Sequence, residues 1–236
     1  MLGVDGLRTT VAGVPAMAWG APARSVLLAV HGLFGNKQDG AIRLAAAAAV
    51  PLGYQVVGVD LPGHGERTDA DRLVPWHCGP ELAAIHDALT SSGRPVDLFA
   101  CSLGAYFSLL GLADRAVGRA VLISPLVDMA AHIDRLMTAR GIDEKHLRAA
   151  RRITFDDGQY LDWHYRRYAR THPIRWNRPT DVLRGGGHEV VPGADIAAFA
   201  AATGARVRHI DAGHAFTTAE DPLVLDWLRT VFADPR

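Results

Sequence analysis

The sequence predicts a mostly parallel, doubly wound α/β sheet interrupted by one helical insertion. Short, near-continuous apolar runs rich in β-branched residues alternate with helical patterns along most of the 236 residues. Such runs are typical of strands buried on both faces of a parallel sheet, and the alternation of strands with helices favours a doubly wound α/β sheet. The alternation stops after Ser124 and resumes near residue 180. That gap predicts an insertion within a single sheet.

The elements before the gap follow in order. Four runs read as buried strands: Ser25–Val30, Tyr54–Val59, Val96–Ala100 and Ala120–Ser124. Helical segments are expected between them: Ile42–Val50, Glu81–Ser91 and a segment starting at Ser102. The region Arg8–Trp19 is compatible with an antiparallel hairpin at one edge of the sheet. With the two strands of this hairpin counted, the insertion follows the sixth strand.

Residues 125–179 contain no convincing strand and are interpreted as a helical lid. Their helical patterns lie around Met129–Arg140, Glu144–Arg152 and Tyr160–Arg170. The elements expected afterwards are a strand at Asp181–Leu183, a helix at Ala194–Ala202, a strand at Arg206–Ile210 and a helix at Pro222–Phe232. The α/β core therefore comprises residues 1–124 and 180–236.

Composition narrows the class of protein. The 25 basic and 25 acidic residues balance, so no general field attracts the chain to nucleic acid or anionic lipid. Cys78 and Cys101 are too few for a disulfide framework or a metal cluster. The N-terminus lacks a signal-peptide pattern, and no apolar run is long enough to span a bilayer. We expect a cytoplasmic protein with no membrane span.

The strongest local signal is the strand-to-helix junction around Ser102. The run VDLFACSLG places small residues, Ala100 and Gly104, two positions before and after this serine. A nucleophile at such a sharp turn needs small residues at both positions and is held in strained geometry above the sheet edge. Were Cys101 the nucleophile, a Phe and a Leu would stand there instead. The alternative reading is an ordinary junction with Ser102 as helix N-cap.

Two further motifs follow neighbouring strands. In HGLFGN, residues 31–36, a backbone N–H can point over the carboxyl edge of the sheet and form an oxyanion hole with the N–H of Leu103. His31 itself is expected to order its loop rather than transfer protons. In DLPGHGER, residues 60–67, Asp60 and His64 are likewise interpreted as parts of a tight loop.

A last motif, DAGHAF at residues 211–216, follows the final strand. A general base must reach the serine Oγ, and His214 lies on a loop in the right layer to do so.

Together, HGLFGN, DLPGHGER, ACSLG and DAGHAF resemble the α/β-hydrolase superfamily, its esterase, lysophospholipase and thioesterase members above all. The resemblance implies the α/β-hydrolase fold, with Ser102 as nucleophile and His214 as base. It further implies that the N–H groups of Leu33 and Leu103 stabilise the oxyanion and that residues 125–179 form a lid over an acyl pocket. No metal or organic cofactor is required.

The resemblance breaks at the acid of the triad. His188 occupies the usual acid position, and a histidine there cannot supply the negative charge that orients the base. Glu189, one residue later in a glycine-rich loop, is the first candidate. Asp128, after the sixth strand, is the second, and absence of an acid is the third possibility. Asp211 lies too near His214 along the chain.

The insertion also carries an aromatic and basic helix. Its marked residues are Tyr160, Trp163, Tyr165, Arg166, Arg167, Tyr168 and Arg170. The favoured reading is an amphipathic helix with a solvated arginine face, and the rival reading is a site for an anionic head group.

The expected function is hydrolysis of a small carboxylic ester or thioester through an acyl-enzyme on Ser102. A peptidase, a C–C bond hydrolase or an acyltransferase could use the same scaffold. From another class, a non-catalytic binding protein with a degraded triad is the alternative. Oligomeric state is left open.

Overall fold

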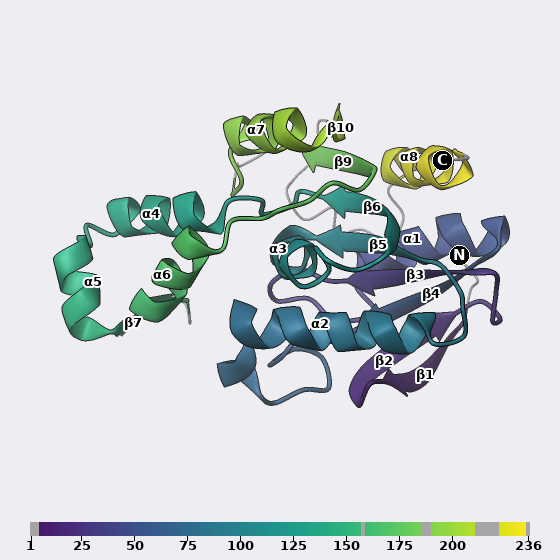
Figure 1. Cartoon of the computed structure of the whole chain (residues 1–236), viewed down its shortest axis with the longest axis horizontal. Coiled ribbons are helices and arrows are strands. Elements are labelled where there is room, and N and C mark those ends of the chain that lie inside the picture. The colour runs from purple at the N-terminus through teal and green to yellow at the C-terminus, as the bar shows by residue number, and fades with distance from the viewer. Residues whose placement is uncertain (1–4, 157–158, 186–189, 211–221, 235–236) are drawn as a thin grey trace.

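The computed structural model describes residues 5–156, 159–185, 190–210 and 222–234. An eight-stranded sheet runs in the order β1-β2-β4-β3-β5-β6-β9-β10 (Figure 1). Its strands are β1 (Gly6–Val11), β2 (Val14–Trp19), β3 (Ser25–Val30), β4 (Tyr54–Val59), β5 (Val96–Cys101), β6 (Val117–Ile123), β9 (Thr180–Gly185) and β10 (Arg206–Ile210). All pairs from β4 to β10 are parallel, which confirms the predicted fold class.

The edge hairpin is also confirmed. Strands β1 and β2 pair antiparallel through a two-residue turn, and β2 pairs antiparallel with β4. The two turn residues, Ala12 and Gly13, have φ of 48° and 80°. Positive φ at both central positions matches the twist of a tight hairpin.

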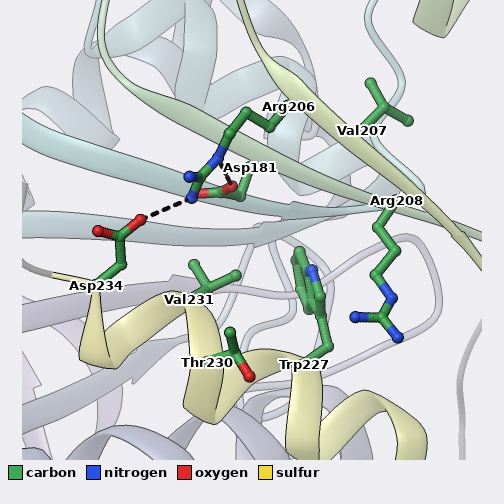
Figure 2. Close-up of a pocket in the computed structure, with 8 residues that line it drawn as sticks. All are labelled: Asp181, Arg206, Val207, Arg208, Trp227, Thr230, Val231 and Asp234. Atoms are coloured by element: carbon green, nitrogen blue, oxygen red, sulfur yellow. Dashed lines mark hydrogen bonds and ion pairs between the residues drawn. The ribbon is translucent and has the colours of Figure 1, made fainter.

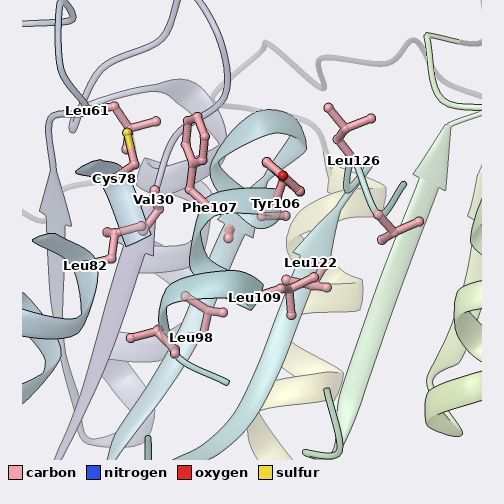
Figure 3. Packing of buried hydrophobic residues seen from close by; sticks show 14 of the residues in the cluster. Val30, Leu61, Cys78, Leu82, Leu98, Tyr106, Phe107, Leu109, Leu122 and Leu126 are labelled. Carbon is pink, nitrogen blue, oxygen red and sulfur yellow. The ribbon is translucent and has the colours of Figure 1, made fainter. Parts of the chain in front are cut away.

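Helices cover both faces of the sheet. These are α1 (Gly40–Ala49), α2 (Pro75–Thr90), α3 (Ser102–Gly111), α7 (Gly193–Thr203) and α8 (Pro222–Ala233). Three further helices, α4 (Met129–Ala139), α5 (Glu144–Ala150) and α6 (Trp163–Thr171), belong to the segment between β6 and β9. Buried side chains of α1 and α8 share one core cluster, and those of α2, α3 and α7 share the other. Figure 3 shows the second cluster, where Leu82 of α2 and Phe107 and Leu109 of α3 lie against strand residues such as Leu98.

Helix α2 begins at Pro75 rather than at Glu81, where the sequence placed it. Pro75 occupies the first turn, where its missing N–H costs no hydrogen bond. Pro80 lies inside the helix, and a proline at that place reads in sequence as a boundary. The burial of α2 residues such as Leu82 and Ile85 against the sheet overrides that local signal.

The segment between β6 and β9 contains α4, α5 and α6, close to the three predicted helices. It also contains a short antiparallel hairpin, β7 (Arg152–Thr154) with β8 (Tyr160–Asp162), so the expectation of no strand there was wrong. The Asp162 carboxylate accepts the Tyr165 N–H at 2.9 Å and starts α6 at Trp163, which leaves Tyr160 in extended chain. Figure 1 shows α4, α5 and α6 on the side to which the arrowheads of β5 and β6 point.

Candidate active site

The turn from β5 into α3 has the sharp geometry that the sequence predicted. Ser102 is the first residue of α3 and has a φ of 46°, in the left-handed region that side chains rarely adopt. A Cβ at Gly104 would collide with the carbonyl oxygen of His31, and one at Gly32 would lie 3.2 Å from the Ser102 Cβ. The requirement for glycine at position 104 therefore comes from the loop after β3, which lies directly against the turn.

Strand register explains why these loops meet. Val30 of β3 is paired with Ala100 of β5, and Cys101 with Ile123 of β6. Parallel strands in register end at one edge, so the residues that follow them emerge together. The chain after β6 is tied to the turn as well, since the Leu126 N–H donates to the Ser102 carbonyl oxygen at 3.1 Å.

Cys101, next to the serine, is unsuited to act as a nucleophile. Burial raises the pKa of its thiol well above the usual range, and the nearby Asp39 carboxylate raises it further. The thiol therefore stays protonated, and the thiolate is the reactive form of cysteine.

The loop after β3 uses most of its backbone donors within the described part of the chain. Each N–H from Phe34 to Asp39 donates to an acceptor, and the acceptors come in order from His64, Gly32, Asp39, Asp60, Asn36 and Asn36. The N–H of Leu33 donates to no acceptor among the described residues. Leu33 follows Gly32, whose backbone lies against Ser102, so this donor lies beside the serine.

Two histidines tie this loop to the one after β4 reciprocally. Nε2 of His31 accepts the Leu61 N–H at 3.0 Å, and Nε2 of His64 accepts the Phe34 N–H at 3.0 Å. The other ring nitrogens face carbonyl oxygens. His31 Nδ1 lies 2.7 Å from the Gly32 oxygen, and His64 Nδ1 lies 2.9 Å from the Pro62 oxygen. Both rings are thus neutral with the proton on Nδ1. We call this pair of contacts the histidine clasp.

The expected structural role of His31 is confirmed by this geometry. The side chain is fully buried, and burial lowers its pKa to about 4 against the raising effect of its hydrogen bond to Gly32. At neutral pH the ring cannot carry a proton to a substrate and also keep its bond to Leu61.

Asp60 also plays the predicted structural role. Its carboxylate accepts the Lys37 ammonium at 2.5 Å, the Lys37 N–H at 2.8 Å and the Glu66 N–H at 3.0 Å. Burial opposes ionisation of Asp60, but these donors together hold its pKa below the usual value. The Glu66 carboxylate lies 2.8 Å from the same ammonium. We call Lys37, Asp60 and Glu66 the buried lysine cluster.

Three of the predicted residues lie outside the described part of the chain: His188, Glu189 and His214. Asp128 is described. It is exposed at the start of α4, where its carboxylate accepts the Ala131 N–H at 2.9 Å and caps the helix.

The arginine face of α6 is not solvated as a whole. Arg166 is 5% exposed and donates to Asp134 of α4 at 2.8 Å and Glu144 of α5 at 3.0 Å. Arg170 donates to the second oxygen of Asp134 at 2.7 Å. The favoured reading of this helix was therefore wrong for Arg166, which joins three helices through internal ion pairs.

A separate hollow of about 320 Å³ lies between β9, β10 and α8 (Figure 2). Its wall includes Arg206, which forms ion pairs with Asp181 and Asp234. Asp181 and Arg206 lie at the start of β9 and β10, so the hollow lies away from the edge that carries Ser102. The described residues contain neither a group of three potential metal ligands nor a helix that could cross a membrane.

A family model described as the alpha/beta hydrolase family matches residues 26–233. The chain belongs to the α/β-hydrolase family. No curated protein matches it.

Solved structures of this family share the fold at low identity. Est1E from Butyrivibrio proteoclasticus, with ferulic acid bound, has a TM-score of 0.76 at 16% identity, over 96% of this chain and 98% of that one. Mouse alpha/beta hydrolase domain-containing protein 10 has a TM-score of 0.76 at 15% identity, over 98% and 97%. A thioesterase domain from the curacin biosynthetic pathway has a TM-score of 0.64 at 15% identity, over 98% and 100%.

The sequence reading missed the histidine clasp. His31 and His64 were each interpreted as ordering their own loop, whereas each accepts a hydrogen bond from the other's. The signal was present, because both histidines follow strands that lie next to each other in a parallel sheet, β3 and β4. Residues after such strands emerge at one edge and can bond across it.

Proposed function

We propose that this α/β hydrolase cleaves small carboxylic esters or thioesters through an acyl-enzyme on Ser102. The observation that carries the proposal is a serine in left-handed geometry next to Gly32, which precedes Leu33. The Leu33 N–H has no acceptor among the described residues. Among the described residues the N–H of Leu103 is likewise without an acceptor. Two such donors suit the oxygen of a tetrahedral intermediate.

In the proposed reaction, Ser102 Oγ attacks the acyl carbon while His214 takes its proton. The N–H groups of Leu33 and Leu103 hold the oxyanion. The intermediate collapses, the bond to the alcohol or thiol breaks, and His214 returns the proton to this leaving group. Water then attacks the acyl-serine with His214 as base, and the acid leaves as the proton returns to Ser102.

Glu189 is proposed as the acid that orients His214. Asp128 is the weaker candidate, because its carboxylate already caps α4. The segment of residues 125–179 is proposed as a lid, since α4 to α6 lie on the side to which β5 and β6 point.

A fluorophosphonate probe together with 4-nitrophenyl acetate tests the nucleophile. Wild type should be labelled and should hydrolyse the ester, and Ser102→Ala should lose labelling and about 10⁶-fold in turnover. Ser92→Ala, which changes an exposed serine after α2, is the matched control and should behave as wild type. Equal labelling of wild type and Ser102→Ala would show that the nucleophile is elsewhere, and wild type without any turnover would favour a binding protein.

A second pair of variants locates the acid. Glu189→Gln should lower kcat by about 10⁴-fold, as expected when a triad base loses its carboxylate partner. Asp128→Asn removes the charge but keeps a good helix cap, so it should leave kcat and stability nearly unchanged. The reverse pattern would assign the acid to Asp128.

To decide between ester and thioester hydrolysis, substrates of both kinds must be compared. The neighbours include an esterase with bound ferulic acid and a thioesterase domain, so oxygen and sulfur esters of one aromatic acid are the first pair to compare. The ratio of kcat/KM for the two esters assigns the preferred bond.

A further inference from the structure

We propose that His64 is a positioning residue, which fixes the loop that carries the Leu33 oxyanion donor by accepting the Phe34 N–H. The inference rests on the proposed function of Ser102 and adds a role for a side chain that touches neither substrate nor serine. Its basis is the geometry of the loop and the hydrogen bond of 3.0 Å between the Phe34 N–H and His64 Nε2.

Residues 32–35 form a strained turn. The Gly35 N–H donates to the Gly32 carbonyl oxygen at 3.2 Å, which makes Leu33 and Phe34 the central residues. Phe34 has a φ of 64°, and Leu33 is not among the residues of positive φ. This combination defines a type II turn, which prefers glycine at its third position. A phenylalanine there costs about 1–2 kcal/mol.

The Phe34 side chain does not hold this conformation, because it is 76% exposed. The competing type I turn differs by a flip of the Leu33–Phe34 peptide. In that turn the Leu33 carbonyl oxygen would replace the Phe34 N–H as the group facing Nε2, and two acceptors would oppose each other. His64 therefore selects the strained turn. It also fixes the peptide dipole next to the Leu33 N–H.

His64 is itself well placed to impose this choice. Its Nδ1 lies 2.9 Å from the Pro62 carbonyl oxygen, which fixes the tautomer that leaves Nε2 as an acceptor. The His64 loop is anchored in turn by the Leu61 N–H bond to His31 and by Arg67, which donates to the Asp60 carbonyl oxygen at 3.2 Å. His64 Nε2 is thus held against the strained turn by a loop that is itself fixed by hydrogen bonds.

Kinetics with a transition-state analogue test the proposal. In His64→Ala, kcat on 4-nitrophenyl acetate should fall about 10- to 100-fold, less than the 10²–10³ lost with a whole oxyanion donor. KM should change little, because the donor acts on the transition state. Affinity for an alkyl boronic acid, whose tetrahedral adduct places an oxygen in the hole, should fall by a similar factor. His64→Gln, with an amide oxygen near the position of Nε2, should restore much of both.

His77→Ala is the matched control, because His77 is an exposed histidine on α2 and should leave kcat and boronate affinity unchanged. A readout independent of catalysis is amide hydrogen exchange. The Phe34 N–H should be protected in wild type and exchange faster in His64→Ala. Rapid Phe34 exchange in wild type would overturn the proposal whatever the kinetics.

The two proposals fail differently. An active wild type whose kcat and boronate affinity survive His64→Ala would reject the positioning role and leave the function of Ser102 intact. A wild type that neither labels with fluorophosphonate nor turns over would reject the proposed function, and the positioning role would fall with it.

Discussion

At the residue scale, the strongest constraints come from backbone geometry rather than from side-chain chemistry. Ser102 and Phe34 both have left-handed φ without being glycine, and they lie on loops that contact each other through Gly32 and Gly104. Non-glycine residues in that region cost energy and persist only where surrounding contacts enforce them. Two such strained residues therefore lie at the edge of the sheet where we place the reaction.

Phe34 provides a direct measure of this strain. At most exposed positions a protein with glycine is less stable than one with alanine. At Phe34, where φ is 64°, we expect the opposite order. We expect Phe34→Gly to be about 1 kcal/mol more stable than Phe34→Ala in urea unfolding. At Leu7, an exposed residue of strand β1, the same pair of substitutions should show the ordinary order. Equal stability of the two Phe34 variants would mean that the turn relaxes in solution.

Sequence reasoning identified the serine turn because its size requirement is local. The small residues at 100 and 104 are visible without a structure, and the contact with His31 explains the glycine at 104. The histidine clasp depends on contacts between loops 30 residues apart in sequence. The spacing of residues along the chain does not indicate which N–H a histidine accepts. The histidine clasp could therefore be found only from the three-dimensional structure.

At the element scale, Arg166 holds the inserted helices together. Its buried guanidinium pairs with carboxylates of both α4 and α5. Periodicity places arginines on one face of α6 but gives no information on the acids they meet. The helices were predicted within a few residues, whereas the β7–β8 hairpin was missed because three-residue strands are too short for an alternation pattern.

Replacing Arg166 should loosen this segment selectively. In Arg166→Ala we expect a loss of about 1–2 kcal/mol, because the paired acids are partly exposed and Arg170 still neutralises Asp134. Hydrogen exchange by mass spectrometry should show faster exchange in α4, α5 and α6 and little change in β3 and β5. Arg167→Ala, an exposed arginine of the same helix, is the control. Uniform acceleration across the sheet would contradict an effect confined to these helices.

At the scale of the whole molecule, buried charges join distant parts of the chain. Arg119 at the start of β6 donates to the carbonyl oxygens of Val231 and Asp234 at 2.7 Å each, which ties the end of α8 to the sheet. The buried lysine cluster does the same for the loops after β3 and β4. The balanced overall charge of the sequence does not indicate which charged residues form these contacts.

The lysine cluster should make stability depend on pH. The pKa of Asp60 is held below its usual value in the fold, so below about pH 4 the unfolded chain binds the extra proton. The stabilising effect is complete above that pH and is lost as pH falls through the folded pKa. Asp60→Asn should be less stable at pH 7 and lose less further stability between pH 5 and about pH 2. Asp71→Asn, at an exposed position, should follow the wild-type curve in urea unfolding at each pH.

Lys37 has a further, practical consequence. The sequence contains one other lysine, Lys145, and it is exposed on α5. The ammonium of Lys37 is buried, and although burial opposes its charge, Asp60 and Glu66 raise its pKa, so it remains protonated and shielded from acylating reagents. Amine-directed dyes should therefore modify a single side chain, at Lys145. Lys145 thus offers an attachment point for a fluorophore on the inserted helices.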